Sequence, residues 1–423
     1  GRYGVTDENG VVVFDLPVDC SFKFRADILG SHYFSDTITV SGTAPNNVGV
    51  DAGGGRLLVT VQEEAGHPME GVKVYLFNPF GSYLGRKGIT DSSGNVSFDV
   101  SGATYRLRAD YLGYRFWSED TEVVTDTAVT LNIAHQDVRI KVKGKYGDTT
   151  EPIEDIKVYL FNASGSYVGR GLRTDQNGEA VFHVPQRAYK VRADYLGGRF
   201  WSGEFTWEDT TVDIPMAEAD VTVTGAGLPR EGVKVYLFST SGSYLGVGKE
   251  TDSEGKARFR VPEGTYKFRA DYQGNRFWSG DQVLAAGQVN PVNISTGGGS
   301  FTLRVENADA VPFAGLKCYV FNEAGSYIGL CGSTNNDGQV SFDLSDGSYE
   351  FRVDYLGHRF WSDTVEVPAS SGVVMTIDER QVSVTVSTAS GPYEGAKVYL
   401  FSENGSYLGK CQATDSSGQV SFS

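Results

Sequence analysis

The five histidines are the first residues to consider for chemistry, because imidazole titrates near neutral pH and serves in catalysis and metal binding. They are His32, His67, His135, His183 and His358. They fall at different places in the repeats described below, so no site shared by the repeats uses them. The sequence has no HExxH, no G-x-S-x-G and no phosphate-binding glycine loop. These observations predict a protein that is not an enzyme.

An arginine that precedes a tryptophan by two residues occurs four times and is a second candidate for a site. The pairs are Arg115 and Trp117, Arg199 and Trp201, Arg276 and Trp278, and Arg359 and Trp361. A guanidinium group stacks well on an aromatic ring, so the pairs predict packing contacts or an interface. Tryptophans exposed in every copy would instead favour carbohydrate binding.

The segment around Tyr75 is apolar on both of its faces. Val74 and Leu76 alternate with Tyr75 and Phe77, so a strand here needs cover on both sides. The cover comes either from the YLGxRFWS segment of the same repeat or from a neighbouring repeat or chain. Tyr75 and Phe77 are therefore candidate packing or interface residues.

The formal net charge of −16 keeps the surface hydrated and argues against a nucleic-acid partner, which needs a basic footprint. Asp51, Asp137 and Asp220 lie where calcium would bind at junctions between repeats. No segment matches a full calcium loop with its closing glutamate. We predict no cofactor, and calcium at the junctions is the alternative that stays open.

Three phrases recur along the chain and predict its organisation. In their first complete copy they are GVKVYLFNPFGSYLG from Gly71, TDSSGNVSF from Thr90 and YRLRADYLGYRFWS from Tyr105. The predicted segments are a partial repeat (1–53), repeat 1 (54–134), repeat 2 (135–217), repeat 3 (218–297), repeat 4 (298–378) and a second partial repeat (379–423).

Alternation with period two dominates each repeat. Val96, Phe98 and Val100 alternate with polar residues, as expected for a half-buried strand, and the TDxxG segments are typical of turns. The predicted fold is all-β: a tandem array of about 80-residue Ig-like or transthyretin-like antiparallel β-sandwiches of about seven strands. The sequence contains no stretch of about 20 apolar residues, so it predicts no membrane span.

The motif order G-x-x-V-x-L, T-D-x-x-G-x-V-x-F and Y-x-x-R resembles carboxypeptidase regulatory-like domains and the related CnaB-type domains of bacterial surface proteins. The likeness covers nearly all of each repeat and implies a transthyretin-like sandwich. It also implies an extracellular, cell-surface role as a stalk, adhesin shaft or pilus-like filament. The implied partner is a second copy of the chain in a head-to-tail polymer. Glycans are the alternative partner.

The resemblance also implies a search for isopeptide bonds, which in CnaB-like domains join a lysine to an asparagine or aspartate beside an acidic residue in a dry core. The recurring candidates are Lys73, Lys157, Lys234, Lys317 and Lys397, with Asp27, Asp110, Asp194, Asp271 and Asp354. The lysine alternates away from the apolar residues of its strand, and no glutamate recurs with it. We therefore expect an ion pair on the outer face, with little effect on stability.

Cysteines and sequons add two further predictions. Cys318 and Cys331 flank a predicted hairpin turn, so a symmetric hairpin places them opposite each other as a disulfide, with two buried thiols as the alternative. Cys20 and Cys411 have no partner within their own repeats. The candidate glycosylation sites are Asn95, Asn162, Asn293 and Asn404.

The two partial repeats would each leave an open sheet edge. Either the sequence is a window of a longer repeat protein, or the tail of one copy is completed by the head of the next, which would produce a filament. Residues 1–14 match residues 409–422, and this overlap favours the window.

Overall fold

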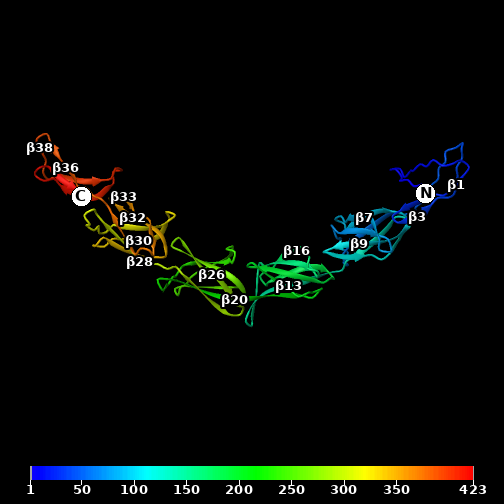
Figure 1. Cartoon of the computed structure of the whole chain (residues 1–423), viewed down its shortest axis with the longest axis horizontal. Helices are drawn as coiled ribbons and strands as arrows, with labels where there is room; N and C mark the ends of the chain where they lie inside the picture. The colour runs from blue at the N-terminus through cyan, green and yellow to red at the C-terminus, as the bar shows by residue number, and fades with distance from the viewer. Residues whose placement is uncertain (1, 423) are drawn as a thin grey trace. The chain divides into compact units, whose positions relative to one another are not determined.

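The computed structural model describes residues 2–422, in which every regular element is a β-strand. The chain divides into two compact units, drawn in Figure 1. The first unit runs to Lys143 and also contains Pro152–Tyr195 and Arg199–Asp213; the second contains Gly144–Glu151, Leu196–Gly198 and the chain from Ile214 onward. No helix among these residues is long and apolar enough to cross a membrane.

Repeat 1 is a sandwich of two sheets. Its strands are β5 (Gly55–Gln62), β6 (Lys73–Phe77), β7 (Tyr83–Ile89), β8 (Asn95–Val100), β9 (Ala103–Tyr111), β10 (Tyr114–Trp117), β11 (Thr121–Val123) and β12 (Thr127–Asn132). One sheet has the order β12-β5-β8. The other has the order β10-β9-β6-β7, and β11 also pairs with β9.

The other repeats use the same arrangement. Repeat 2 contains β13 (His135–Tyr146), β14 (Thr149–Pro152), β15 (Lys157–Asn162), β16 (Tyr167–Arg173), β17 (Glu179–Pro185), β18 (Tyr189–Tyr195), β19 (Gly198–Trp201) and the start of β20 (Thr210–Gly225). Repeat 3 contains the rest of β20, β21 (Leu228–Pro229), β22 (Lys234–Ser239), β23 (Tyr244–Glu250), β24 (Lys256–Pro262), β25 (Gly264–Tyr272), β26 (Asn275–Leu284) and β27 (Val289–Ser295). Repeat 4 contains β28 (Gly299–Glu306), β29 (Lys317–Asn322), β30 (Tyr327–Ser333), β31 (Gln339–Leu344), β32 (Gly347–Tyr355), β33 (His358–Trp361), β34 (Val365–Val367) and β35 (Gly372–Thr376).

The two partial repeats are shorter sets of strands. The first contains β1 (Ser21–Phe22), β2 (Arg25–Ile28), β3 (Ser31–Phe34) and β4 (Ile38–Thr39). The second contains β36 (Val382–Thr385), β37 (Ser387–Thr388), β38 (Gly391–Pro392), β39 (Lys397–Phe401), β40 (Tyr407–Ala413) and β41 (Gln419–Phe422). The six segment boundaries given above stay predictions.

The core of each sandwich lies between its two sheets. In repeat 1, Leu57 and Val59 of β5 pack in one fully buried cluster with Val74 and Leu76 of β6 and Leu107 of β9. Repeats 3 and 4 contain equivalent clusters. The alternation of apolar and polar residues thus places one side of each strand in the core, and the predicted array of all-β sandwiches is confirmed.

The first and last strands of repeats 1, 3 and 4 pair in parallel. The parallel pairs are β5 with β12, β20 with β27, and β28 with β35. The remaining strand pairs of repeat 1 are antiparallel, as the sequence predicted. β10 and β11 both pair antiparallel with β9 and so run the same way, which leaves the first and last strands of repeat 1 pointing in one direction. As a result the chain enters a repeat at one end and leaves it at the other.

A buried threonine holds the TDxxG turn of each complete repeat to the loop that precedes β6 or its equivalent. In repeat 1 the Thr90 hydroxyl donates to the carbonyl of Met69 (2.5 Å) and accepts from the N–H of Val72 (2.9 Å). The turn itself closes on Asp91, whose carboxylate accepts the N–H groups of Ser93 and Asn95, both at 2.9 Å. The sequence predicted the turn but not the role of the threonine.

Replacing Thr90 with valine is expected to lower the free energy of unfolding of repeat 1 by about 1–2 kcal/mol, because it leaves a buried N–H and a buried carbonyl without a partner. Hydrogen-exchange mass spectrometry of peptides from repeat 1 measures the change. Thr130→Val, at an exposed position of β12, is the matched control and should change exchange little.

The cysteine pairing predicted from a symmetric hairpin is wrong. The register places Cys331 opposite Tyr319 and Cys318 opposite Gly332, and all four cysteines are free thiols. A register shift between Tyr319 and Phe321 removes the symmetry, and Gly329 lies within it at a φ of +85°. Cys318 is buried, which raises the pKa of its thiol to about 12, whereas Cys331 is exposed.

Candidate functional site

An arginine surrounded by aromatic rings forms the same cluster in every complete repeat. In repeat 1 the guanidinium carbon of Arg108 lies 4.6 Å from the ring centroid of Tyr75, 5.1 Å from that of Phe77 and 5.7 Å from that of Trp117. Asp110 accepts two hydrogen bonds from Arg108, at 2.8 and 3.0 Å. We call this set of five residues, with its equivalents, the arginine platform.

The stacked arginine is not the one that the sequence predicted. Arg108 lies opposite Trp117 in the pairing of β9 with β10, whereas Arg115 lies opposite Asp110 and is exposed. The equivalent arginines Arg199, Arg276 and Arg359 are exposed as well. In the other complete repeats the stacked arginines are Arg192, Arg269 and Arg352. The proximity of arginine and tryptophan in sequence was misleading because their contact is made across a strand pair.

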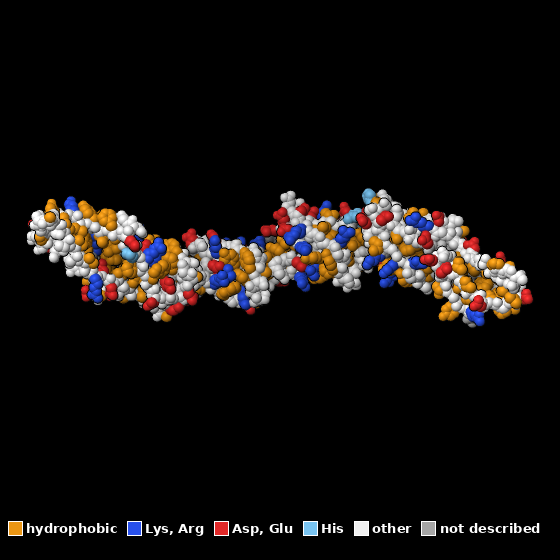
Figure 2. Space-filling view, turned by 90° about the horizontal axis from the view of Figure 1, so that it is seen from above, with side chains coloured by type: hydrophobic (Ala, Val, Ile, Leu, Met, Phe, Trp, Pro, Cys, Tyr) orange, Lys and Arg blue, Asp and Glu red, His pale blue; other side chains and the backbone are white. Residues whose placement is uncertain are grey.

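The platform covers the outer face of β6 with residues of its own repeat. The Phe77 ring is 6% exposed and lies 4.8 Å from the Trp117 ring. Trp117 is 45% exposed, and Trp201, Trp278 and Trp361 have exposed fractions of 46–47%. One side of each tryptophan therefore packs and the other meets solvent. Figure 2 shows surface hydrophobic side chains interspersed with acidic and basic ones.

The lysine and aspartate considered for an isopeptide bond lie opposite each other on this same outer face. Lys73 pairs with Asp110 in register, and the side chain of Lys73 is exposed. The Asp110 carboxylate is held by Arg108 instead of Lys73. The arrangement agrees with an outer-face ion pair and not with a bond formed in a dry core.

The turn between β9 and β10 is the second recurring feature, and the sequence did not predict its contact. Leu112 and Gly113 form this turn with φ values of +47° and +77°. A Cβ on Gly113 would lie 3.0 Å from Asn162 of repeat 2. Tyr114 donates its hydroxyl hydrogen to the carbonyl of Ala188, also in repeat 2. We call this turn, with its equivalents, the joint hairpin.

The joint hairpin of repeat 3 contacts repeat 4 in the same way. The side chain of Gln273 donates to the carbonyl of Asp343 (2.8 Å) and accepts from the N–H of Ser345 (2.7 Å). Asn275 donates to the Tyr349 hydroxyl (3.0 Å). The Leu-Gly or Gln-Gly pair that recurs within YLGxRFWS was the signal that sequence reasoning could have used.

Tyr349 and Tyr189 occupy the same buried position, but only the first has hydrogen bonds at its hydroxyl. The Tyr349 hydroxyl contacts Ser345 at 2.7 Å as well as Asn275, whereas the Tyr189 hydroxyl is buried without a hydrogen-bond partner among the described residues. Tyr349→Phe is expected to cost about 1 kcal/mol of stability and Tyr189→Phe close to none. Thermal unfolding of the two variants tests this difference, and equal costs would contradict it.

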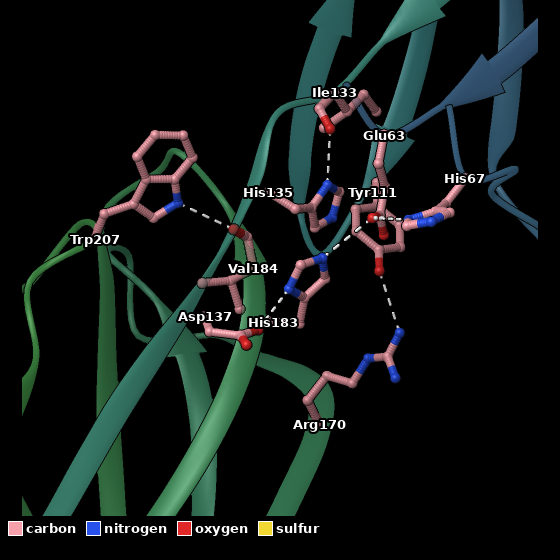
Figure 3. Close-up of polar contacts among 10 residues, drawn as sticks. All are labelled: Glu63, His67, Tyr111, Ile133, His135, Asp137, Arg170, His183, Val184 and Trp207. Atoms are coloured by element: carbon pink, nitrogen blue, oxygen red, sulfur yellow. Dashed lines mark hydrogen bonds and ion pairs between the residues drawn. The ribbon is translucent and has the colours of Figure 1, made fainter. Parts of the chain in front are cut away.

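A cluster of ionisable groups lies where repeat 1 meets repeat 2, within the first unit (Figure 3). The two ring nitrogens of His183 contact carboxylates: Nδ1 lies 2.7 Å from Asp137 and Nε2 lies 3.2 Å from Glu63. His135 stacks on His183 with ring centroids 5.1 Å apart. His67 Nδ1 lies 3.4 Å from the same Glu63 oxygen that His183 contacts.

Comparison with known proteins matches one repeat to a family. Residues 56–136 match the Carboxypeptidase regulatory-like domain. Repeat 1 is therefore similar to this family. Serine-aspartate repeat-containing protein D of Staphylococcus aureus (strain Newman) is 37% identical over 82 residues, which are 19% of this chain and 6% of that protein. The resemblance inferred from the motifs is thereby confirmed.

Two solved structures align with more of the chain than this regulatory-like domain. The Bacillus anthracis TIE protein is 14% identical, with 86% of this chain and 73% of that chain covered and a TM-score of 0.22. The major pilin subunit of Bacillus cereus is 12% identical, with 77% and 98% covered and a TM-score of 0.20. At these TM-scores the alignments support no conclusion about this chain.

The calcium and glycan candidates lie at ordinary positions of the repeats. Asp51 accepts the N–H of Gly53 (2.8 Å), Asp137 contacts His183, and Asp220 lies 3.5 Å from Arg258. Within residues 2–422 no group of three or more His, Cys, Asp or Glu side chains is placed to hold a metal ion. Of the sequons, Asn293 and Asn404 are exposed, and Asn95 and Asn162 are half-buried. Calcium and glycosylation stay predictions.

Proposed function

We propose that this chain is a structural, non-enzymatic segment of an extracellular fibre, cell-surface stalk or adhesin shaft. The observation that carries the proposal is the path of the chain through each repeat, which enters at one end of the sandwich and leaves at the other. Each repeat adds length, and the joint hairpin contacts the repeat that follows. The match of repeat 1 to a segment of a larger repeat-containing protein agrees with this role.

Glycine-rich linkers support a shaft with defined joints. A Cβ on Gly54, between the first partial repeat and repeat 1, would lie 2.1 Å from the carbonyl oxygen of Val100. A Cβ on Gly298, between repeats 3 and 4, would lie 1.8 Å from that of Leu344. These glycines allow the linker to pass directly against the end of a strand, so they act in packing and not as flexible spacers.

The same contact supports assembly between chains. A joint hairpin of one copy that docked on the receiving surface of another would join copies head to tail by the contact that already joins repeats. A head-to-tail contact that does not close into a ring produces a filament. The expected partner is therefore a second copy of this chain.

Electron microscopy of the purified protein, with and without a calcium chelator, tests the proposal. Long fibres of uniform width with an axial repeat would support assembly, and their loss in chelator would place calcium at the junctions. Separate short rods made of a few beads would retain the stalk and exclude the filament. Collapsed particles without a beaded outline would contradict both.

Carbohydrate binding is a second candidate, favoured by the tryptophan that is about half exposed in every complete repeat. An aromatic ring that is fixed on one side by Phe77 and Arg108 presents its other side to a sugar without further ordering. Glycan-array binding should fall strongly when Trp117, Trp201, Trp278 and Trp361 are all replaced by alanine. Replacement of the exposed Val181 and Val283 is the control, and equal binding by all variants would exclude this function.

A further inference from the structure

One position of the strand before the buried tyrosine contacts the preceding repeat in repeats 2, 3 and 4 and carries a different side chain in each of these three repeats. We call it the joint position. It is Asp99 in repeat 1, His183 in repeat 2, Arg260 in repeat 3 and Asp343 in repeat 4. The residues on either side of it are a phenylalanine and a valine or leucine in all four repeats, whereas the residue two positions before it also varies.

In repeats 3 and 4 the joint position carries a permanent charge with an opposite charge before it. Within the second unit, the guanidinium group of Arg260 lies 3.7 Å from Glu151 and 4.3 Å from the ring centroid of Tyr146. Asp343 accepts two hydrogen bonds from Arg230, whose side chain is 10% exposed. Arginine and aspartate do not change charge near neutral pH, so these two contacts are insensitive to it.

In repeat 2 the joint position is His183, which contacts both repeats at once. Its Nδ1 faces Asp137 of its own repeat and its Nε2 faces Glu63 of repeat 1 (Figure 3). An imidazole donates from both nitrogens only when it is protonated. A neutral ring would therefore leave one carboxylate against a nitrogen lone pair.

His135 has the opposite requirement. Its Nδ1 donates to the carbonyl of Ile133 (2.8 Å), while its Nε2 is buried without a hydrogen-bond partner among the described residues. A proton on Nε2 would place a charge in a site without an acceptor. The ring lies between His183 and Tyr111, whose hydroxyl accepts from Arg170 (3.2 Å).

We propose that the joint between repeats 1 and 2 is a proton-sensitive hinge, unlike the joints at Arg260 and Asp343, and that it is most firmly docked near the pH at which His183 is protonated and His135 is neutral. The groups that face the two imidazoles are Glu63, His67, Tyr111, Asp137 and Arg170. Repeat 1 supplies the first three, and repeat 2 the others.

The pKa shifts agree with this geometry. Burial alone would lower the pKa of His183, but its hydrogen bonds to Asp137 and Glu63 raise it above the ordinary value. Burial lowers the pKa of His135, and the charge of the neighbouring His183 adds to the effect. The stabilisation from His183 is complete below about pH 6.5, its ordinary pKa, and is lost as the pH rises through the raised pKa. The neutral His135 destabilises docking as the pH falls below about 6.5, because the undocked ring then binds a proton that the docked ring excludes.

Single-molecule energy transfer on the full chain tests the proposal. Cys20, Cys331 and Cys411 are replaced by serine, and the buried Cys318 is left in place. Dyes at Ile89→Cys and Leu172→Cys report on repeats 1 and 2, and dyes at Val283→Cys and Val374→Cys report on repeats 3 and 4. Between about pH 5 and about pH 8, the first pair of dyes should show its narrowest distribution of energy-transfer efficiency near pH 6.5. The docked fraction should fall about twofold to fivefold at lower and at higher pH. The second pair should not change.

Two variants assign the effect to the two imidazoles. His183→Arg copies the residue at the joint position of repeat 3 and should remove the loss of docking at high pH. His135→Phe should remove the loss of docking at low pH and leave the loss at high pH unchanged. The proposal would be overturned if the energy-transfer distribution for repeats 1 and 2 did not change with pH. It would also be overturned if the His183→Arg protein still lost docking at high pH. The comparison with repeats 3 and 4 in the same chain holds even if one variant fails to fold.

Discussion

Replacing Gly298 with alanine is expected to lower the free energy of unfolding of repeat 4 by about 2–5 kcal/mol. Gly298 has a φ of +78°, where an L side chain is strained, and its Cβ would lie 1.8 Å from the carbonyl oxygen of Leu344. The clashing atom is backbone, so the linker or the end of β31 has to move. Hydrogen-exchange mass spectrometry of peptides from β28 and β31 measures the loss of protection.

Gly203→Ala is the matched control for this substitution. Gly203 is exposed, and a Cβ there would have no heavy atom within 4 Å. Its replacement is expected to change the stability by no more than about 0.5 kcal/mol. If Gly298→Ala left the protection of repeat 4 unchanged, the linker between repeats 3 and 4 would be a flexible tether, and the shaft with defined joints would lose its main support.

Replacing Arg192 with methionine is expected to destabilise repeat 2 by about 2–4 kcal/mol. The Arg192 side chain is 18% exposed and donates two hydrogen bonds to Asp194, at 2.7 and 2.9 Å. Its guanidinium carbon lies 5.0 to 5.8 Å from the ring centroids of Tyr159, Phe161 and Trp201. Methionine keeps an unbranched apolar chain, so the loss reports on the charge and its hydrogen bonds more than on packing volume. The thermal unfolding transition of repeat 2 should move to a lower temperature.

Arg199→Met separates the arginine platform from the arrangement that sequence spacing suggested. Arg199 precedes Trp201 by two residues but is exposed, so this substitution should change stability by less than about 0.5 kcal/mol. Equal destabilisation by the two substitutions would mean that the contact between arginine and tryptophan is not specific to Arg192. A stable Arg192→Met protein would mean that Phe161 and Trp201 hold the platform without a cation.

The joints combine one contact that recurs with one that differs. The joint hairpin presents its turn to the next repeat and so specifies that a repeat follows. The joint position presents aspartate, histidine or arginine and so distinguishes one neighbour from another. Charge complementarity of this kind adds more to specificity than to affinity. A shaft built on it keeps a fixed order of repeats and has one joint that responds to protons.

Most of the fold could be predicted from the sequence because its determinants are local. The alternation of Val96, Phe98 and Val100 with polar residues fixes which face of β8 is buried, and the aspartate and glycine of TDxxG favour a tight turn in any context. The recurrence of the phrases predicts how often the sandwich is built. The parallel pairing of β5 with β12 is not local, because it depends on which strands become neighbours after the chain has crossed between the sheets.

The candidate sites illustrate what the sequence by itself determined and what only the tertiary structure decided. The sequence determined that tryptophan, arginine and aspartate recur in every complete repeat at constant spacing. The tertiary structure decided that Arg108, and not Arg115, stacks on Trp117, because antiparallel pairing sets β9 against β10 with Arg108 opposite the tryptophan. It also decided, through one register shift, that Cys318 and Cys331 are not opposite each other. His183 and Glu63 are 120 residues apart in the chain, and only the docking of one folded repeat on the next brings their charges together.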